Sequence, residues 1–99
     1  MIELTVRQRL AAILAADAVG YSRLMAGDER ATVAMLDAAR PVFRTQIEAH
    51  QGRVIDMAGD SVLAVFETAT GAVSAALAVQ EELKTVVANV SEDRRMRFR

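Results

Sequence analysis

Two short strand-like segments separated by three residues constrain the fold more than any other feature of the sequence. Residues 53–57 and 61–66 are rich in strand-forming types, and Ala58-Gly59-Asp60 lies between them. A connection this short that contains glycine and aspartate favours a β-hairpin. The two segments are therefore predicted to be antiparallel neighbours in one sheet.

A further strand is predicted near the N-terminus, where the apolar run from Leu10 to Ala16 is followed by Asp17. An uninterrupted apolar run is typical of a strand that is buried on both faces of a sheet. Arg7 and Arg9 precede it, but the run ends at Asp17 without a clear cleavage site, unlike a secretory signal. It is also far shorter than the roughly 20 apolar residues of a membrane span. We therefore predict a cytoplasmic protein with no membrane span in this chain.

Helices are predicted on both sides of the hairpin. Asp28 is a candidate N-cap for the first long helix, and Gly52 is its candidate left-handed terminator. Pro41 removes one hydrogen bond inside this helix and predicts a bend or break there. Thr68 or Thr70 is expected to cap the second long helix. The apolar stripe of the first helix comprises Val33, Leu36, Phe43 and Ile47.

The alternating residues 95–99 begin a last strand, so the predicted order of elements is β-α-β-β-α-β. This order is typical of the split βαβ, or ferredoxin-like, palm-type fold. It is an α+β fold in which helices pack on one face of an antiparallel sheet. With 99 residues the chain has room for a single domain. Because the sequence stops inside its last strand, we expect it to be part of a longer protein.

Composition limits the chemistry to carboxylates, hydroxyls, arginines and backbone amides. The chain has no cysteine and one histidine, which excludes a thiolate nucleophile and a cysteine- or histidine-rich metal site. Twelve basic and thirteen acidic residues give a net charge of -1, without the basic field that nucleic acid attracts. The four arginines among the last six residues alternate with apolar residues, which favours a solvated strand face. No nucleic-acid partner is therefore predicted.

Two carboxylates are predicted to meet at one end of the sheet. Asp17 follows the first strand and Asp60 lies in the hairpin turn, and the first and third strands are neighbours in this topology. Two close carboxylates repel each other unless a cation lies between them. Magnesium suits such a pair, because it takes one or two carboxylates together with substrate phosphates.

The turn Val19-Gly20-Tyr21-Ser22 adds anion-binding groups to this pair, because it opens a short helix whose N–H groups can point at a phosphate. Gly20 lets the backbone approach a phosphate closely. Carboxylates beside free amides predict a nucleotide-polyphosphate site. The alternative is ordinary loop chemistry, since aspartate at strand ends and Gly-Asp turns are common in loops.

These residues also carry a family resemblance. Asp17-Ala18-Val19-Gly20-Tyr21-Ser22 resembles the first metal motif of class III adenylate/guanylate cyclase catalytic domains. Gly52-Arg53-Val54-Ile55 followed by residues 59–66 resembles the second metal motif, and residues 92–99 resemble the segment after the third helix in bacterial members. The resemblance covers about residues 9–99. It implies an N-terminal extension over residues 1–8 and, over 9–99, the N-terminal part of a cyclase catalytic domain, truncated after the start of the last core strand.

The resemblance implies a two-metal conversion of a nucleoside triphosphate, ATP by default, to a 3′,5′-cyclic nucleotide and pyrophosphate. Asp17 and Asp60 match the catalytic aspartates that hold two Mg²⁺ or Mn²⁺ ions, and the carbonyl of Ala18 completes one metal site. The amides of Val19, Gly20, Tyr21 and Ser22 would contact phosphate oxygens. Active sites in the family are shared between two catalytic domains, so the resemblance also implies a homodimer or a second cyclase domain.

Departures from the family leave alternatives open. Asp56 stands at the base-specifying position, which is usually lysine in adenylate cyclases and glutamate in guanylate cyclases. The family's transition-state asparagine and arginine lie beyond the stretch that matches Arg99. We therefore expect the chain by itself to be catalytically inactive. The alternatives are a guanylate cyclase, a catalytically silent cyclase-like dimerisation or regulatory module and, more distantly, another palm-type nucleotidyl transferase.

Overall fold

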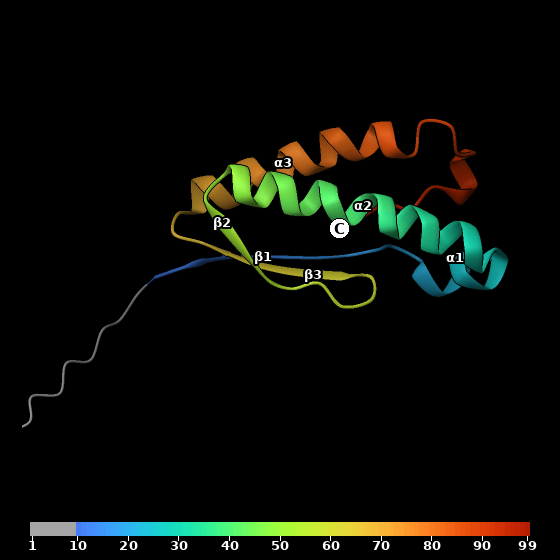
Figure 1. Cartoon of the computed structure of the whole chain (residues 1–99), viewed down its shortest axis with the longest axis horizontal. Helices are drawn as coiled ribbons and strands as arrows, with labels where there is room; N and C mark the ends of the chain where they lie inside the picture. The colour runs from blue at the N-terminus through green and yellow to red at the C-terminus, as the bar shows by residue number, and fades with distance from the viewer. Residues whose placement is uncertain (1–9) are drawn as a thin grey trace, which may run out of the picture.

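A three-stranded antiparallel sheet in the order β1-β3-β2 is the frame of the molecule (Figure 1). The computed structural model describes residues 10–99, so the predicted extension over residues 1–8 lies outside the described part of the chain. The α+β, ferredoxin-like order of elements is confirmed. The elements are β1 (Ala12–Asp17), α1 (Tyr21–Gly27), α2 (Glu29–Ala49), β2 (Gly52–Asp56), β3 (Ser61–Phe66), α3 (Ala69–Val86) and the 3₁₀-helix η1 (Glu92–Arg94).

The predicted strand pairings are confirmed. β2 and β3 form an antiparallel hairpin, and Gly59 in its connecting loop takes a positive φ of 56°. β3 also pairs with β1, in a register that runs from Ala12 opposite Phe66 to Asp17 opposite Ser61. The first and third strands are therefore neighbours, and the end of β1 lies beside the start of β3.

The core lies on one face of the sheet, where α2 and α3 cover it (Figure 1). No element within residues 10–99 covers the opposite face, where Ile13 remains 57% exposed. The prediction that the first strand is buried on both faces is therefore wrong, because helices cover only one of them. The buried sheet and helix residues of the core include Leu14, Val62, Ala64, Phe66, Leu36, Phe43, Ile47, Ala75 and Val79.

The N-terminus of α2 is confirmed at Asp28, whose side chain accepts a hydrogen bond from the Ala31 N–H at 3.0 Å. Of the bend or break predicted at Pro41, the break is absent, because α2 continues through Pro41 to Ala49. Pro41 and Asp37, whose carbonyl loses its helical partner, are both exposed. Water can therefore replace the missing hydrogen bond.

The end of α2 differs from the prediction. The left-handed residue after the C-cap is Gln51, with φ of 60°, and not Gly52. Gly52 begins β2 and lies against the Phe66 ring, which a β-carbon at this position would overlap. Close packing between the strand and the ring therefore explains this glycine.

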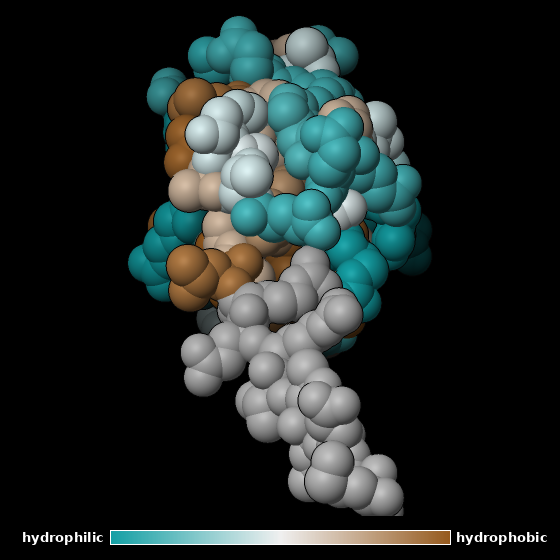
Figure 2. All heavy atoms as spheres, turned by 90° about the vertical axis from the view of Figure 1, so that its left-hand side faces the viewer, coloured by the Kyte–Doolittle hydropathy of each residue, from teal (hydrophilic) through white to brown (hydrophobic). Residues whose placement is uncertain are grey.

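The N-cap of α3 is Thr68, whose hydroxyl accepts a hydrogen bond from the Gly71 N–H at 3.0 Å. The outer side of α3 carries Val73 and Leu77, which are 58% and 68% exposed. Figure 2 views the molecule from the end at which α3 begins, and shows apolar side chains reaching the surface in separate groups among polar ones. None of the helices within residues 10–99 is both long and apolar enough to cross a membrane.

The predicted last strand is present only as a single antiparallel bridge between Ala18 and Phe98. The backbone of Asp17 exchanges two hydrogen bonds of 2.9 Å with that of Arg99 beside this bridge. The segment is held from the core side as well, because the Phe98 ring meets the Phe43 ring edge-on at 5.0 Å. The C-terminal residues therefore lie along β1, on the side away from β3.

Candidate functional site

The end of β1 and the tip of the hairpin bring the predicted metal-binding residues together. Asp17, the last residue of β1, lies opposite Ser61, the first residue of β3. Asp60 directly precedes Ser61, and its carbonyl accepts a hydrogen bond from the Ala18 N–H at 3.2 Å. The backbones of Asp17, Ala18 and Asp60 are therefore neighbours, as the sequence predicted.

The Ala18 backbone faces the hairpin. The N–H and C=O of one strand residue point to the same side of the strand in an antiparallel ladder. Because the Ala18 N–H reaches the carbonyl of Asp60, the Ala18 carbonyl also points towards the hairpin tip. This carbonyl and the two aspartates offer oxygen ligands at one end of the sheet.

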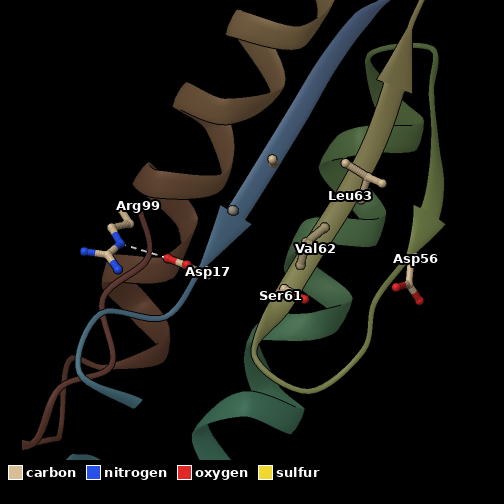
Figure 3. A pocket seen from close by; sticks show the side chains of 8 residues that line it. Asp17, Asp56, Ser61, Val62, Leu63 and Arg99 are labelled. Atoms are coloured by element: carbon tan, nitrogen blue, oxygen red, sulfur yellow. Dashed lines mark hydrogen bonds and ion pairs between the residues drawn. The ribbon is translucent and has the colours of Figure 1, made fainter. Parts of the chain in front are cut away.

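An open depression of about 510 Å³ lies on the uncovered face of the sheet beside Asp17. Figure 3 shows Asp17 at one side of this depression, Asp56 at the other, and residues of β3 between them. Asp60 is not among the residues that line the depression; its contact with the end of β1 is the backbone hydrogen bond to Ala18. The lining residues are Ala15, Ala16, Asp17, Asp56, Ser61, Val62, Leu63 and Arg99.

The Asp17 carboxylate has an arginine partner that the sequence did not predict. Its Oδ1 accepts a hydrogen bond from Arg99 Nε at 2.9 Å (Figure 3). The two side chains are 47% and 72% exposed. An ion pair this exposed contributes about 0–1 kcal/mol. Arg99 therefore holds the Asp17 carboxylate only weakly.

Asp56 ends β2 on the exposed side of the hairpin. Its Oδ1 accepts a hydrogen bond from the Met57 N–H at 2.9 Å. The pairing of β2 with β3 is irregular between Val54 and Asp56. Asp56 and Asp17 both line the depression, on opposite sides of β3.

The predicted phosphate-binding turn leads directly into α1. Gly20 is the N-cap with φ of 65°, the left-handed conformation that glycine adopts without strain. Tyr21 and Ser22 form the first turn, where N–H groups have no partner within the helix. The Val19 N–H is donated to the Arg97 carbonyl at 2.7 Å. The Tyr21 side chain packs against the core.

The donor set fits a hard divalent cation. Within residues 10–99 there is no group of three or more histidine, cysteine, aspartate or glutamate side chains that could hold a metal ion alone. Asp17 and Asp60 offer two carboxylates, and Ala18 offers a carbonyl. Magnesium takes one or two carboxylates and completes its shell with water and substrate phosphates. The oxygen donors of these residues are therefore of the kind that magnesium prefers.

No family model matches the chain, but a curated protein of Rhizobium meliloti (strain 1021), named "Putative adenylate cyclase 3", does. The two are 46% identical over 95 residues, which make up 95% of this chain and 16% of that protein. This chain therefore spans about a sixth of the length of the curated relative.

Solved structures of cyclases are also similar to this chain. The adenylate/guanylate cyclase/hydrolase from Silicibacter pomeroyi has a TM-score of 0.72 at 33% identity, over 95% of this chain and 54% of that one. A bacterial light-regulated adenylyl cyclase has a TM-score of 0.77 over 89% of this chain and 28% of that one, and at 21% identity it shows the fold alone. In sequence and in fold, this chain is similar to proteins and structures that are named adenylate or guanylate cyclases.

Proposed function

We propose that this chain forms the metal- and phosphate-binding part of a nucleotidyl cyclase domain. The domain would convert a nucleoside triphosphate, ATP by default, to a 3′,5′-cyclic nucleotide and pyrophosphate in cyclic-nucleotide signalling. One observation carries the proposal: Asp17 and Asp60 are backbone neighbours across the β1–β3 ladder. The cyclase names of the sequence and structure relatives agree with it.

Asp17, Asp60 and the Ala18 carbonyl would hold two Mg²⁺ or Mn²⁺ ions. Such ions, when bound, activate the ribose 3′-hydroxyl and neutralise the triphosphate. The task of this chain is to keep two carboxylates at a fixed separation. A short antiparallel ladder suits that task, because its cross-strand hydrogen bonds fix the end of β1 against the start of β3.

The turn before α1 would receive the phosphates. The N–H groups of Gly20, Tyr21 and Ser22 open a helix three residues after Asp17, so they suit an anion that also touches the metal ions. The Val19 N–H bonds to the Arg97 carbonyl, so a contact of this amide with phosphate would require that bond to break.

Asp56 would specify the base. Its carboxylate borders the same depression as Asp17 and offers only hydrogen-bond acceptors. Acceptors match the N–H donors of guanine. This position therefore favours a guanylate cyclase as the second candidate function, while loss of the usual lysine also suits a catalytically silent regulatory module.

A complete site would need a second cyclase domain or a second copy of this chain. The open face of the sheet beside the depression carries Ile13, Ile55 and Leu63, which are 57%, 46% and 38% exposed. Such a face suits burial against another domain. The 99-residue chain would then bind metal and nucleotide weakly and be inactive by itself.

A thermal-shift experiment tests this proposal. We expect Mn²⁺ together with a non-hydrolysable ATP or GTP analogue to raise the melting temperature of the chain more than either component alone. The comparison of the two analogues measures base preference. An equal shift in the presence of EDTA would contradict a metal-dependent site.

Replacing Arg99 with glutamine is expected to tighten Mn²⁺ binding in the absence of nucleotide. The change removes the side chain that bonds to Asp17 Oδ1. Because exposed ion pairs contribute up to about 1 kcal/mol, the gain should reach about fivefold at most. Isothermal titration measures it. Arg97→Gln is the matched control, since it removes the same charge from an arginine that pairs with Glu92. Equal gains in both variants would contradict a specific contact.

A further inference from the structure

We propose that Arg40 of α2 is a positioning residue that holds the hairpin tip, and with it Asp60, in place beside β1. The inference rests on the proposed function, because it concerns the same aspartate. Arg40 is far from Asp60 in sequence, but its guanidinium reaches the loop that carries Asp60. Its Nη2 donates a hydrogen bond to the carbonyl of Gly59 at 2.9 Å.

Three successive carbonyls at the hairpin tip are held by three different elements. The Ala58 carbonyl accepts hydrogen bonds from the backbone N–H and hydroxyl of Ser61 in β3, both at 3.0 Å. The Asp60 carbonyl accepts from Ala18 at the end of β1. The Gly59 carbonyl, between them, accepts from Arg40. Arg40 therefore supplies the helix-side attachment of a loop that is otherwise attached to strands.

The Arg40 side chain is itself fixed. Its Nη1 donates to Asp37 Oδ1 at 3.1 Å, one turn earlier in α2. Its Nε is buried and has no hydrogen-bond partner within the described residues. A buried donor without a partner costs free energy. The guanidinium is thus held in an orientation in which Nη1 and Nη2 bond to Asp37 and Gly59, while Nε has no partner within residues 10–99.

The hairpin tip needs an attachment of this kind. The pairing between β2 and β3 is irregular between Val54 and Asp56, so the ladder is disturbed just before the loop. Gly59 has a left-handed φ of 56°, and a β-carbon built on it would have no atom within 4 Å. Side-chain packing therefore does not hold this residue, and the bond from Arg40 to its carbonyl limits the positions open to Asp60.

Loss of the Arg40 charge and loss of its contact with Gly59 have opposite expected effects on Mn²⁺ binding. Removing a positive charge near a cation site strengthens cation binding by Coulomb's law. Removing a contact that orients a ligand weakens metal binding by about 10- to 100-fold. The sign of the change therefore separates a positioning role from simple electrostatics.

Titration of Mn²⁺ into the wild type and into Arg40→Ala, Arg40→Lys and Arg44→Ala tests the sign. Arg44 is an exposed arginine one turn further along α2, so Arg44→Ala removes the same charge. We expect Arg40→Ala to bind Mn²⁺ about tenfold more weakly than the wild type. Arg40→Lys should recover part of the affinity, and Arg44→Ala should bind at least as tightly as the wild type. Equal or tighter binding by Arg40→Ala would overturn the proposal.

Hydrogen exchange of the Ala18 amide, measured without metal, provides the second readout. This amide bonds to Asp60, so we expect exchange to be faster in Arg40→Ala and unchanged in Arg44→Ala. Should Arg40→Ala fail to fold, Arg40→Gln is measured in its place. Unchanged exchange would overturn the positioning role whether or not metal binds. Absence of Mn²⁺ binding by the wild type, with faster exchange in the variant, would instead overturn the proposed function alone.

Discussion

Alanine at either Asp17 or Asp60 is expected to abolish the thermal stabilisation that Mn²⁺ and a nucleoside triphosphate analogue give the wild type. A ligand at 100 times its dissociation constant stabilises a protein by about 2.7 kcal/mol. For a domain of this size that corresponds to about 10–20 °C in melting temperature. Each variant removes one of two carboxylates at the end of the sheet, and with it half of the carboxylate ligands and half of the negative charge offered to the cations. We therefore expect the whole shift to disappear in each variant.

Asp93→Ala is the matched control for these two variants. Asp93 is an exposed aspartate of η1, and Arg23 contacts its carbonyl rather than its side chain. This variant should keep the full shift. Equal shifts in the wild type, Asp17→Ala and Asp60→Ala would remove the metal site.

Phe98→Ala is expected to destabilise the chain by about 3–5 kcal/mol. Phe98 is 8% exposed and meets Phe43 edge-on, so its removal leaves a cavity beside α2. Its carbonyl also accepts a hydrogen bond from Gln80 at 2.9 Å, which ties the segment to α3. A loss of this size is a large share of the 5–15 kcal/mol by which ordinary domains are stable. Urea unfolding followed by circular dichroism measures the change.

Arg97→Ala is the neighbouring control for Phe98→Ala. The exposed Arg97 side chain forms an ion pair with Glu92 at 3.3 Å. Its removal should change the free energy of unfolding by less than about 0.5 kcal/mol. A small loss in Phe98→Ala would show that the segment carrying Arg99 is not docked in the core.

Local signals in the sequence were sufficient for several elements. The Ala58-Gly59-Asp60 connection predicted the hairpin, and the Asp28 cap predicted the start of α2; both are confirmed. The pairing of β1 with β3 followed from the order of elements. These features depend on turn chemistry, capping and topology, each of which is encoded within a short stretch or in element order.

Features that depend on contacts between residues distant in sequence could not be predicted from these local signals. The apolar run before Asp17 predicted burial on both faces. The sequence of a single strand, however, does not determine whether other elements cover both faces of its sheet. Pro41 predicted a bend or break, but α2 does not break there, because packing of the remainder of α2 against the core outweighs one lost hydrogen bond at an exposed position. Gly52 predicted a helix terminator, whereas the Phe66 ring explains it.

In the candidate site too, the sequence predicted some features and not others. The ends of two predicted strands placed Asp17 and Asp60 together, and the ladder confirms that their backbones are neighbours. The arginine contacts did not follow from the sequence, because Arg99 and Arg40 reach the site from segments whose position only the tertiary structure defines. A register prediction for the last strand would have placed Arg99 opposite Asp17.

The most direct test of the central claim is paramagnetic broadening of backbone amide signals by Mn²⁺ in the wild-type chain. Mn²⁺ broadens signals only of nuclei close to it, so the affected amides locate the ion. We expect the amides of Asp17, Ala18, Asp60 and Ser61 to broaden together at the lowest Mn²⁺ concentrations, while those of α3 remain sharp. Broadening confined to one of the two aspartate segments, or spread evenly over the surface, would contradict a shared metal site.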